Sequence, residues 1–591
     1  MEQSTLQAAR PAIGLIQGLL LLKLYRAAEF HFWPGTDPQV FAPLLVAALF
    51  VPLVGISGLG NIRPRTLIGW LTAATILCVG LAFYDIFRNP TDMSRISDEF
   101  LSGAPRNVVS LQFWPLLAGM LFIAHVMVMA SDADRRVIAR YATYFDISWK
   151  HGIQALLAAL FVGVFWAILF LGGGLFALIK ISALNDLIKE DYFWIPGTAL
   201  ATGYALHLTD VRAALTRGAR SLVLFLLSWL LPIMTLLAVG FVAALPFKGL
   251  EALWSTRHAG AILLATCAML VFLINTAYQD GESDQPLVLR LSRLAASLIL
   301  LPLTALAGYA LLLRVQQYGW SPDRVVAAAC TSIAAFYALG YLYAAARFGL
   351  PLRGLELVNI VTAVAIVLIV VGVLAPIADP ARISVNSQVA RLLSGKVAPE
   401  QFDFAFLKFD AGRYGQAALV GLGAGTGDGP AQTIAERATA MLSQRRRTSS
   451  APGSSPLRNG HIEVIWPQNG TLPDSFSHGE WEGARYAYYS PAPCLSKVGE
   501  CDAALIDLDG DGQDEVILWA RPSGETSVFK LDGDRWKHVG SLEAGLCGGV
   551  REAMRQGKFE LMAAPFKDIL VSGNRLRVNN LAGCGRYAPT P

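Results

Sequence analysis

The stretch from Gly152 to Ile179, GIQALLAALFVGVFWAILFLGGGLFALI, contains no Asp, Glu, Lys or Arg over 28 residues. A helix needs only about 20 apolar residues to cross the hydrocarbon core of a bilayer. Further charge-free runs of at least 18 residues lie at 38–62, 66–84, 107–131, 192–209, 221–247, 258–279, 294–313, 325–346 and 357–378. The sequence therefore predicts a mainly α protein, a polytopic helical membrane bundle of ten or eleven spans followed by a short helical segment and a small soluble β domain.

Two segments leave the number of spans open. In segment 11–33 only 12 residues are free of charge before Lys23, Arg26 and Glu29. It either spans, with these side chains reaching the interface, or lies flat on the membrane surface; we expect it to span. The run 192–209 is the shortest of the ten and contains an early Pro-Gly pair, so a re-entrant half-helix is the alternative there.

Charge counting predicts an orientation. Alternate loops between the runs carry thirteen Lys or Arg on one side and nine on the other, and the richer side is expected in the cytoplasm. The chain then leaves its last span on the outer face of a bacterial inner membrane. We predict four parts: a transmembrane domain at 1–378, a juxtamembrane helical segment at 379–443, a flexible linker at 444–460 and a β domain at 461–591.

The residues after 378 change in character. Amphipathic patterns predict short helices at 383–395 and 399–423, broken at Gly395, Gly412 and Gly415, and a third helix at 430–442. A stretch rich in Ser, Pro, Gly and Arg then predicts the linker. Short β-type runs bounded by turn residues predict strands at 462–466, 484–489, 503–508, 515–520, 527–531, 536–542, 569–571 and 576–578.

The β domain holds four of the seven cysteines, Cys494, Cys501, Cys547 and Cys584. An even set in a small domain favours two disulfides in an oxidising compartment. The more local pairing is Cys494–Cys501 with Cys547–Cys584. Free thiols in a cytoplasmic domain are the alternative, and a zinc site is disfavoured because no pair has CxxC spacing. Cysteine placement and charge counting both favour a periplasmic tail.

One short motif in the β domain predicts a metal site. Asp507, Asp509 and Asp511 are followed by Gln513, which offers its backbone carbonyl, and by Glu515. Oxygen ligands at this spacing suit Ca²⁺. The twelfth position carries Leu rather than the Glu of an EF-hand, and β-type runs flank the loop. It therefore resembles the calcium loop of integrin-like FG-GAP repeats, which implies Asp507, Asp509, Asp511 and Glu515 as side-chain ligands. A metal-free hairpin is the alternative; we expect a structural Ca²⁺ without a catalytic role.

Polar residues inside the predicted spans are few, and the candidates for a transport pathway are His125, Asn275, Pro232 and Pro302. Intramembrane ionisable groups often mark function, and mid-span prolines free carbonyl groups that line cavities. The commoner roles of such residues are hydrogen bonds between helices and tolerated kinks. Asp210 and Lys150, at span ends, are expected to be interfacial anchors.

Enzyme signatures are missing: the sequence has no Walker loop, no GxSxG and no HExxH. This favours a non-enzymatic protein. The Lys and Arg residues are spread between loops, and the net charge is only +4, so a nucleic-acid partner is not expected.

Two stretches carry a family resemblance. One is Trp149–Ile181, a long span rich in aromatic residues. The other is ARISVNSQVARLLSGKVAPEQFDFAFLKFDAGRYGQAAL, which contains Arg382, Ser384, Gln388, Arg391, Leu392, Gly395, Phe402, Asp403, Phe404, Gly412 and Gly415. Together they resemble a family of bacterial membrane proteins known as domain of unknown function 4153. The resemblance covers about residues 10–425 and implies the membrane architecture; the family has no established activity.

Three hypotheses of function follow. In the first, the bundle anchors in the bilayer a disulfide-bonded, calcium-stabilised β domain that meets a ligand or an envelope protein outside the cytoplasm, in a sensing or scaffold role. In the second, the protein is a transporter of a small solute. In the third, it is a membrane enzyme acting on a lipid-linked substrate. Scarce intramembrane charge favours the first over an ion-coupled transporter.

Overall fold

The chain divides into two compact units, Met1–Gln444 and Arg445–Pro591, and we describe each by itself. In the first unit the computed structural model describes residues 3–89, 109–211, 213–249, 259–281, 285–350, 352–425 and 427–444. In the second it describes 462–468, 470–478, 481–482, 500–521, 526–533, 535–540, 542, 548–561, 569–571 and 574–576.

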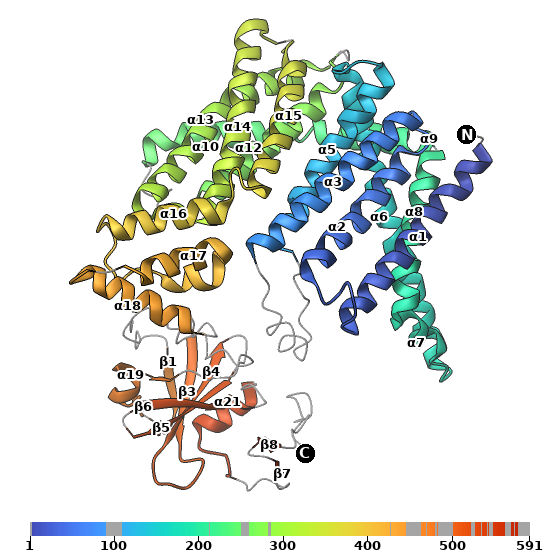
Figure 1. Ribbon diagram of the computed structural model, residues 1–591. Helices are drawn as coiled ribbons and strands as arrows, with labels where there is room; N and C mark the ends of the chain where they lie inside the picture. The colour runs from blue at the N-terminus through green and yellow to red at the C-terminus, as the bar shows by residue number, and fades with distance from the viewer. Residues whose placement is uncertain are drawn as a thin grey trace. The chain divides into compact units, whose positions relative to one another are not determined.

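Helices, all of them long except α7, build most of the first unit (Figure 1). They are α1 (Gln3–Glu29), α2 (Pro38–Gly58), α3 (Pro64–Arg88), α5 (Phe113–Asp134), α6 (Tyr141–Leu178), α7 (Ala183–Lys189), α8 (Asp191–Val211), α9 (Ala213–Ser228), α10 (Leu231–Lys248), α12 (Ala259–Tyr278), α13 (Leu287–Tyr318), α14 (Pro322–Phe348) and α15 (Leu355–Leu374). Within the described residues, ten segments are long and apolar enough to cross a membrane. The predicted polytopic helical bundle is confirmed.

The ten segments differ from the ten predicted runs in two places. Helix α1 provides one of the ten segments, Ala8–Glu29, which overlaps the predicted segment 11–33. Helix α8, at the predicted run 192–209, does not belong to the ten, yet it is one continuous helix of 21 residues, about 31 Å long, and not a half-helix. Helices α9 and α10 share the apolar stretch Thr216–Lys248.

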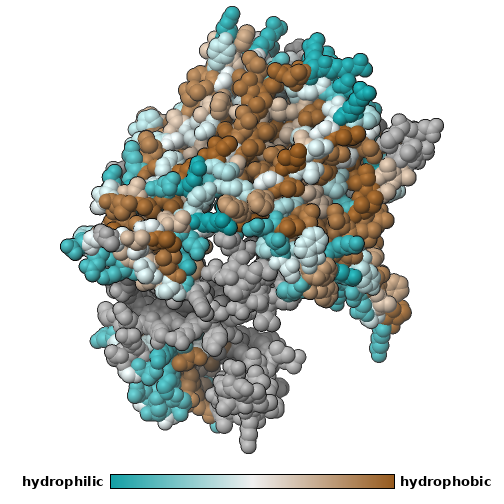
Figure 2. Space-filling view, in the orientation of Figure 1, coloured by the Kyte–Doolittle hydropathy of each residue, from teal (hydrophilic) through white to brown (hydrophobic). Residues whose placement is uncertain are grey.

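The outward faces of these helices are apolar, as lipid contact requires. Helix α6 has 38 residues, and only 6% of its most apolar window is buried. Leu160 and Leu171 on this helix are more than half exposed. Figure 2 shows hydrophobic residues over much of the visible face of the helical unit, with hydrophilic ones along its upper edge and in patches across its lower part. We therefore treat the helical unit as spanning a bilayer.

Two apolar cores hold the bundle together. One lies among α10, α12, α13 and α14, where Leu270, Ile274 and Tyr341 are fully buried. The other joins α2, α3 and α5 to α15 around Phe113 and Leu117. Helix α15 contacts helices of both cores, α14 in the first and α3 and α5 in the second.

Three short helices follow the last span: α16 (Pro380–Leu393), α17 (Gly412–Gly423) and α18 (Pro430–Ser443), around their own small core. The segment predicted at 399–423 is broken at Gly412, as expected: a loop and one π-helical turn, η1 (Phe406–Asp410), come before that glycine, and α17 begins there. Gly412 has a φ of +53°, and a Cβ there would lie 2.2 Å from the carbonyl oxygen of Arg88. The close contact between the segment and α3 therefore requires glycine.

The second unit is built on a six-stranded mixed sheet in the order β1-β3-β4-β5-β6-β2. Its strands are β1 (Ile462–Trp466), β2 (Trp481–Glu482), β3 (Glu500–Ile506), β4 (Glu515–Arg521), β5 (Thr526–Asp532) and β6 (Arg535–Gly540), and a separate pair is formed by β7 (Ile569–Val571) and β8 (Asn574–Leu576). Two helices, α19 (Asp474–His478) and α21 (Gly548–Arg555), accompany the sheet. The predicted small β domain is confirmed; the predicted strand at 484–489 lies outside the described residues.

The sheet is buried on both faces. Phe476 of α19 packs with Phe529 and Trp536 on one face. On the other face Trp519 packs in a cluster with Met554 of α21. Strand β4 is accordingly buried at every position from Glu515 to Ala520.

Candidate functional site

The predicted metal loop connects β3 to β4, whose last paired residues are Ile506 and Glu515. Oxygens of Asp507, Asp509 and Asp511 all lie within 4.8 Å of one another. Gly510 and Gly512, with φ angles of +78° and +85°, provide the left-handed backbone that turns the three carboxylates toward one point. The structure thus brings together the three aspartates that the motif singled out.

Backbone amides hold the loop in this shape. The two carboxylate oxygens of Asp507 accept from Gly510 N at 2.7 Å and Gly512 N at 2.9 Å, and Asp511 Oδ1 accepts from Gln513 N at 2.9 Å. Glu515 is 3% exposed, and its Oε2 accepts from the amide of Leu508 at 2.7 Å. The loop is therefore ordered by the carboxylates themselves, which leaves further lone pairs for a hard cation.

A lysine that the motif did not reveal reaches into this cluster from β5. The ammonium of Lys530 donates to Asp509 and to Asp511, the latter at 2.7 Å, and lies 3.8 Å from Glu515 Oε1. These hydrogen bonds lower the pKa of Asp511 and raise the pKa of Lys530 from their ordinary values. One ammonium thus lies beside three carboxylates. The loop keeps a net negative charge that would attract a metal cation, but the cation would have to compete with Lys530 for Asp509 and Asp511.

The pairing of β4 with β5 explains why Lys530 stands there. Val516 pairs with Phe529, so the next residue of β5 lies beside the mouth of the loop. The hairpin pattern of the sequence holds this information, but only once the register of the two strands is known.

The cysteines of the second unit are described only in part. Cys501 on β3 is fully buried, and Cys494, Cys547 and Cys584 lie outside the described residues. The free thiols in the described part of the chain are Cys78, Cys267 and Cys330, all on helices of the first unit.

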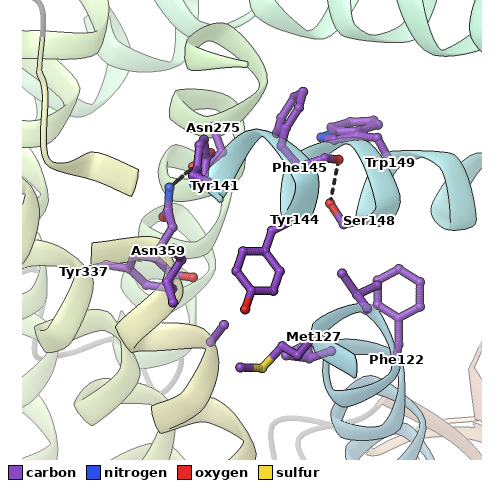
Figure 3. A pocket seen from close by; sticks show the side chains of 14 residues that line it. Phe122, Met127, Tyr141, Tyr144, Phe145, Ser148, Trp149, Asn275, Tyr337 and Asn359 are labelled. Carbon is purple, nitrogen blue, oxygen red and sulfur yellow. Dashed lines mark hydrogen bonds between the residues drawn. The ribbon is translucent and has the colours of Figure 1, made fainter. Parts of the chain in front are cut away.

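Within the membrane bundle, a cavity of about 220 Å³ lies among α5, the start of α6, α12, α14 and α15 (Figure 3). It is lined by Phe122, Ile123, Val126, Met127, Tyr141, Tyr144, Phe145, Ser148, Trp149, Asn275, Tyr337, Asn359, Ile360 and Ala363. In Figure 3 the ring of Tyr144 stands between Asn359 and Met127. The walls are mostly aromatic and aliphatic, so this is an apolar cavity with one polar edge.

That polar edge is a closed ring of hydrogen bonds. Asn275 Nδ2 donates to Tyr341 OH at 2.8 Å, Tyr341 OH donates to Asn359 Oδ1 at 2.7 Å, and Asn359 Nδ2 donates to Asn275 Oδ1 at 2.6 Å. Tyr141 OH joins the ring at 3.2 Å from Asn359 Nδ2. The ring pins α6, α12, α14 and α15 to one another, which is the common use of amides between membrane helices.

His125 has a structural position outside the cavity lining. Trp70 Nε1 donates to its Nδ1 at 3.0 Å, and its Nε2 lies 3.0 Å from Ser57 Oγ. Because an indole nitrogen can only donate, Nδ1 must be the acceptor and the neutral ring carries its proton on Nε2. Protonation of His125 would break the bond to Trp70, so this histidine ties α2, α3 and α5 together and is a poor proton carrier.

The two candidate prolines do not line the cavity that Asn275 borders. Pro232 falls in the first turn of α10, where its missing N–H costs nothing. Pro302 lies inside the unbroken helix α13 and faces Pro246 of α10 across a shallow apolar groove. Of the four predicted residues only Asn275 reaches the cavity.

Sequence reasoning missed a polar cluster around Asp210, which it treated as a lone anchor. Its carboxylate accepts from Arg10 Nη2 at 2.6 Å, from Lys150 Nζ at 2.7 Å and from Gln154 Nε2 at 3.2 Å. These residues come from α1, α6 and α8. Their separation in the sequence, 200 residues for Arg10 and Asp210, hid the contact.

Two ion pairs and a close backbone contact join helices α1 and α8. Beyond the Arg10–Asp210 pair, Arg26 at the far end of α1 binds Asp191 at 2.7 and 2.9 Å, so the two helices run antiparallel. Between these pairs a Cβ on Gly203 would lie 3.0 Å from Arg10 O and 3.3 Å from the Cα of Gly14. Small residues thus allow backbone contact, as in other closely packed membrane helices.

The stretch that carries the family resemblance docks the juxtamembrane helices on the bundle. Gln388 Nε2 donates to the carbonyls of Tyr318 at 2.9 Å and Trp320 at 2.8 Å. Arg391 donates to the carbonyls of Gln316 and Gln317 at 3.2 and 2.7 Å. Both side chains therefore satisfy carbonyl groups at and just beyond the end of α13, which no helical N–H can reach.

A second contact ties the start of α16 to the end of α3. Asp379 is fully buried and accepts from Ala381 N at 2.7 Å, which caps α16, and from Tyr84 OH at 2.7 Å. Arg88 lies between Asp379 at 3.2 Å and Asp85 at 2.6 Å. One buried guanidinium thus serves two buried carboxylates.

The comparisons with known proteins agree with this core architecture. No curated protein and no solved structure matches the chain. The model of the family described as domain of unknown function (DUF4153) matches residues 40–419, from α2 into α17. This match covers more than half of the chain, and the protein therefore belongs to the DUF4153 family.

Proposed function

We propose that this protein is a membrane anchor that presents a calcium-stabilised β domain to a ligand or protein partner outside the cytoplasm. The observation that carries the proposal is the convergence of Asp507, Asp509 and Asp511 within 4.8 Å on a glycine-shaped loop. Glu515 would provide a fourth carboxylate, and the carbonyl of Gln513 a further oxygen. The ion would clamp the β3–β4 hairpin and would have no catalytic part.

An extracytoplasmic position belongs to the same proposal. It is supported by the Lys and Arg bias between loops and by Cys501, which is fully buried and is not one of the free thiols. A disulfide from Cys501 to Cys494, with Cys547 paired to Cys584, would suit an oxidising compartment. A reporter enzyme fused to the C-terminus, active only outside the cytoplasm, tests the orientation; activity of a cytoplasm-only reporter would overturn it.

Calcium binding is best tested on the full chain in detergent, by calorimetric titration and by the melting of the β unit in Ca²⁺ or EGTA. Single loops in extracellular modules bind with a Kd of about 0.1–1 mM. At 10 mM Ca²⁺ such binding stabilises the folded state by about 1.4–2.7 kcal/mol.

Matched variants make the result specific. Asp509→Asn and Asp511→Asn should abolish the calcium-dependent shift. Asp532→Asn removes a more exposed carboxylate from the next turn, where it pairs with Lys537 at 2.5 Å, and should leave the shift unchanged. Absence of any shift in the unmodified chain, or an equal loss in Asp532→Asn, would refute the calcium site.

The cavity beside Asn275 favours transport of a small apolar solute as a second candidate function. The test places a cysteine at Ser148, which lines this cavity, in a chain whose Cys78, Cys267 and Cys330 are alanine. Labelling by a membrane-impermeant thiol reagent from both sides of oriented vesicles would support alternating access. Labelling from neither side would exclude a pathway through this cavity.

A further inference from the structure

A crevice of about 960 Å³ opens among α12, α13 and α14, at the ends of these helices near which α16 docks. Its apolar wall combines small residues, namely Ala259, Gly260, Ala261, Ala307, Ala310 and Ala327, with the larger Leu264, Leu311, Leu313 and Val326. Polar residues stand where it opens: Arg314, Gln317, Tyr318, Asp323 and Arg324. Its volume falls in the range of about 300–1,000 Å³ that is typical of small-molecule sites.

The mouth of the crevice carries excess positive charge. Arg314 and Arg324 place their guanidinium carbons 6.0 and 5.5 Å from the ring centre of Tyr318. Arg391 of α16 binds carbonyl groups of the same α13 terminus. Within the described part of the chain no carboxylate forms an ion pair with any of these three arginines, and Asp323 is the single acidic residue that lines the crevice.

The position of the mouth relative to the bilayer follows from the spans. Tyr318 ends the apolar segment Leu287–Tyr318, and Asp323 lies in the first turn of the segment Pro322–Phe348. The mouth therefore lies at the level of the lipid headgroups, where tyrosine is enriched. The alanine-lined wall extends from there between helices that face the acyl chains.

We propose that this crevice binds one anionic phospholipid, with its phosphate at Arg314 and Arg324 and an acyl chain along the wall formed by Gly260 and its alanine neighbours. Basic pockets between membrane helices recognise anionic headgroups in this way. A free phosphate ion would satisfy the arginines and leave the apolar wall empty, so the apolar lining of the crevice favours a lipid. The crevice shares no lining residue with the cavity at Asn275.

The test is native mass spectrometry of the full chain in mild detergent, titrated with phosphatidylglycerol or with phosphatidylcholine of the same acyl chains. The unmodified chain should retain the anionic lipid preferentially. Each arginine near an anionic headgroup contributes about fivefold, so Arg314→Gln with Arg324→Gln should reduce the preference about 25-fold.

The matched control is Arg290→Gln with Arg347→Gln, which removes the same charge from the opposite ends of α13 and α14. It should keep the preference. An equal loss in both double variants would show that the net charge of the helices, and not this crevice, selects the lipid, and would overturn the proposal.

A steric variant tests the acyl chain separately. A Cβ at Gly260 would have no atom within 4 Å, so Gly260→Leu should fill part of the crevice without strain. It should lower retention of both lipids at least several-fold. Unchanged retention in this variant, or displacement of phosphatidylglycerol by millimolar inorganic phosphate, would overturn the placement of a lipid here.

Discussion

Replacement of Arg88 by methionine should release the juxtamembrane helices from the membrane bundle. Only 11% of the Arg88 side chain is exposed, and it bridges Asp85 and Asp379, whose side chains are 2% and 0% exposed. Arg88→Met keeps an unbranched, mostly apolar stem but removes the guanidinium, which leaves Asp85 and Asp379 without the cation that bridges them. Removal of one partner from a buried pair costs about 3–5 kcal/mol.

The same network provides a graded comparison. Asp379→Ala removes the cap of α16, worth about 1 kcal/mol, and one hydrogen bond from Tyr84, worth a similar amount. It leaves Arg88 paired with Asp85, so no buried charge is orphaned. The expected cost is about 2 kcal/mol, less than that of Arg88→Met although Asp379 is the more deeply buried residue.

The assay is limited proteolysis of the full chain in detergent, with cleavage between α15 and α17 followed over time and tryptophan fluorescence as the measure of global unfolding. A cost of about 3 kcal/mol raises the undocked population more than 100-fold. The control is Arg382→Met, which replaces a partly exposed arginine of α16. It should change the rate of cleavage little. Cleavage of Arg88→Met no faster than that of Asp379→Ala would refute the reasoning about orphaned carboxylates.

Three further outcomes are expected. Lys530→Met should strengthen calcium binding about two- to fivefold, because the ammonium no longer competes for Asp509 and Asp511; titration showing equal or weaker binding would argue against competition. Burial lowers the pKa of His538 below its ordinary 6.5, so the unfolded chain takes up a proton first as the pH falls. The β unit should therefore lose stability below pH 6.5. His538→Phe should weaken the dependence of its melting temperature on pH between pH 7 and 5.5; an unchanged pH dependence would contradict the role given to His538. Gly203→Leu should destabilise the bundle by about 1–3 kcal/mol through overpacking against α1, whereas Gly197→Leu on the same helix, with no atom within 4 Å of its Cβ, should be tolerated in thermal melts.

Features that depend on neighbouring residues were predictable from the sequence. Charge-free runs located the spans because burial in lipid acts on each helix separately. The Asp507–Asp511 motif predicted converging carboxylates because the loop geometry is set by its own glycines and amides. The break at Gly412 was predictable for the same local reason, whereas the π-helical turn before it was not predicted, nor was the close approach of this glycine to Arg88, which is a tertiary contact.

Features that depend on distant partners were not predictable. Asn275 and Asn359 were each expected to bond between helices, but that they bond to each other, across 84 residues, was not predictable. Lys530 enters the acidic loop only through the strand register, and Asp210 gathers cations from helices early and midway in the chain. One sequence without pairing information cannot identify such contacts, because many residues of suitable type are available on other helices.

The antiparallel fastening of α1 to α8 has a consequence for biogenesis. Arg10 and Asp210 are separated by 200 residues, and a ribosome adds about 5–20 residues per second. The first helix therefore waits roughly 10–40 seconds after its own synthesis before its main neighbour emerges. In that interval α2 is available as a companion, since Gln17 Nε2 donates to the carbonyls of Ala48 at 3.0 Å and Leu49 at 2.9 Å. The early hairpin of α1 and α2 would keep the first helix in place in the translocon or bilayer until its long-range partner arrives.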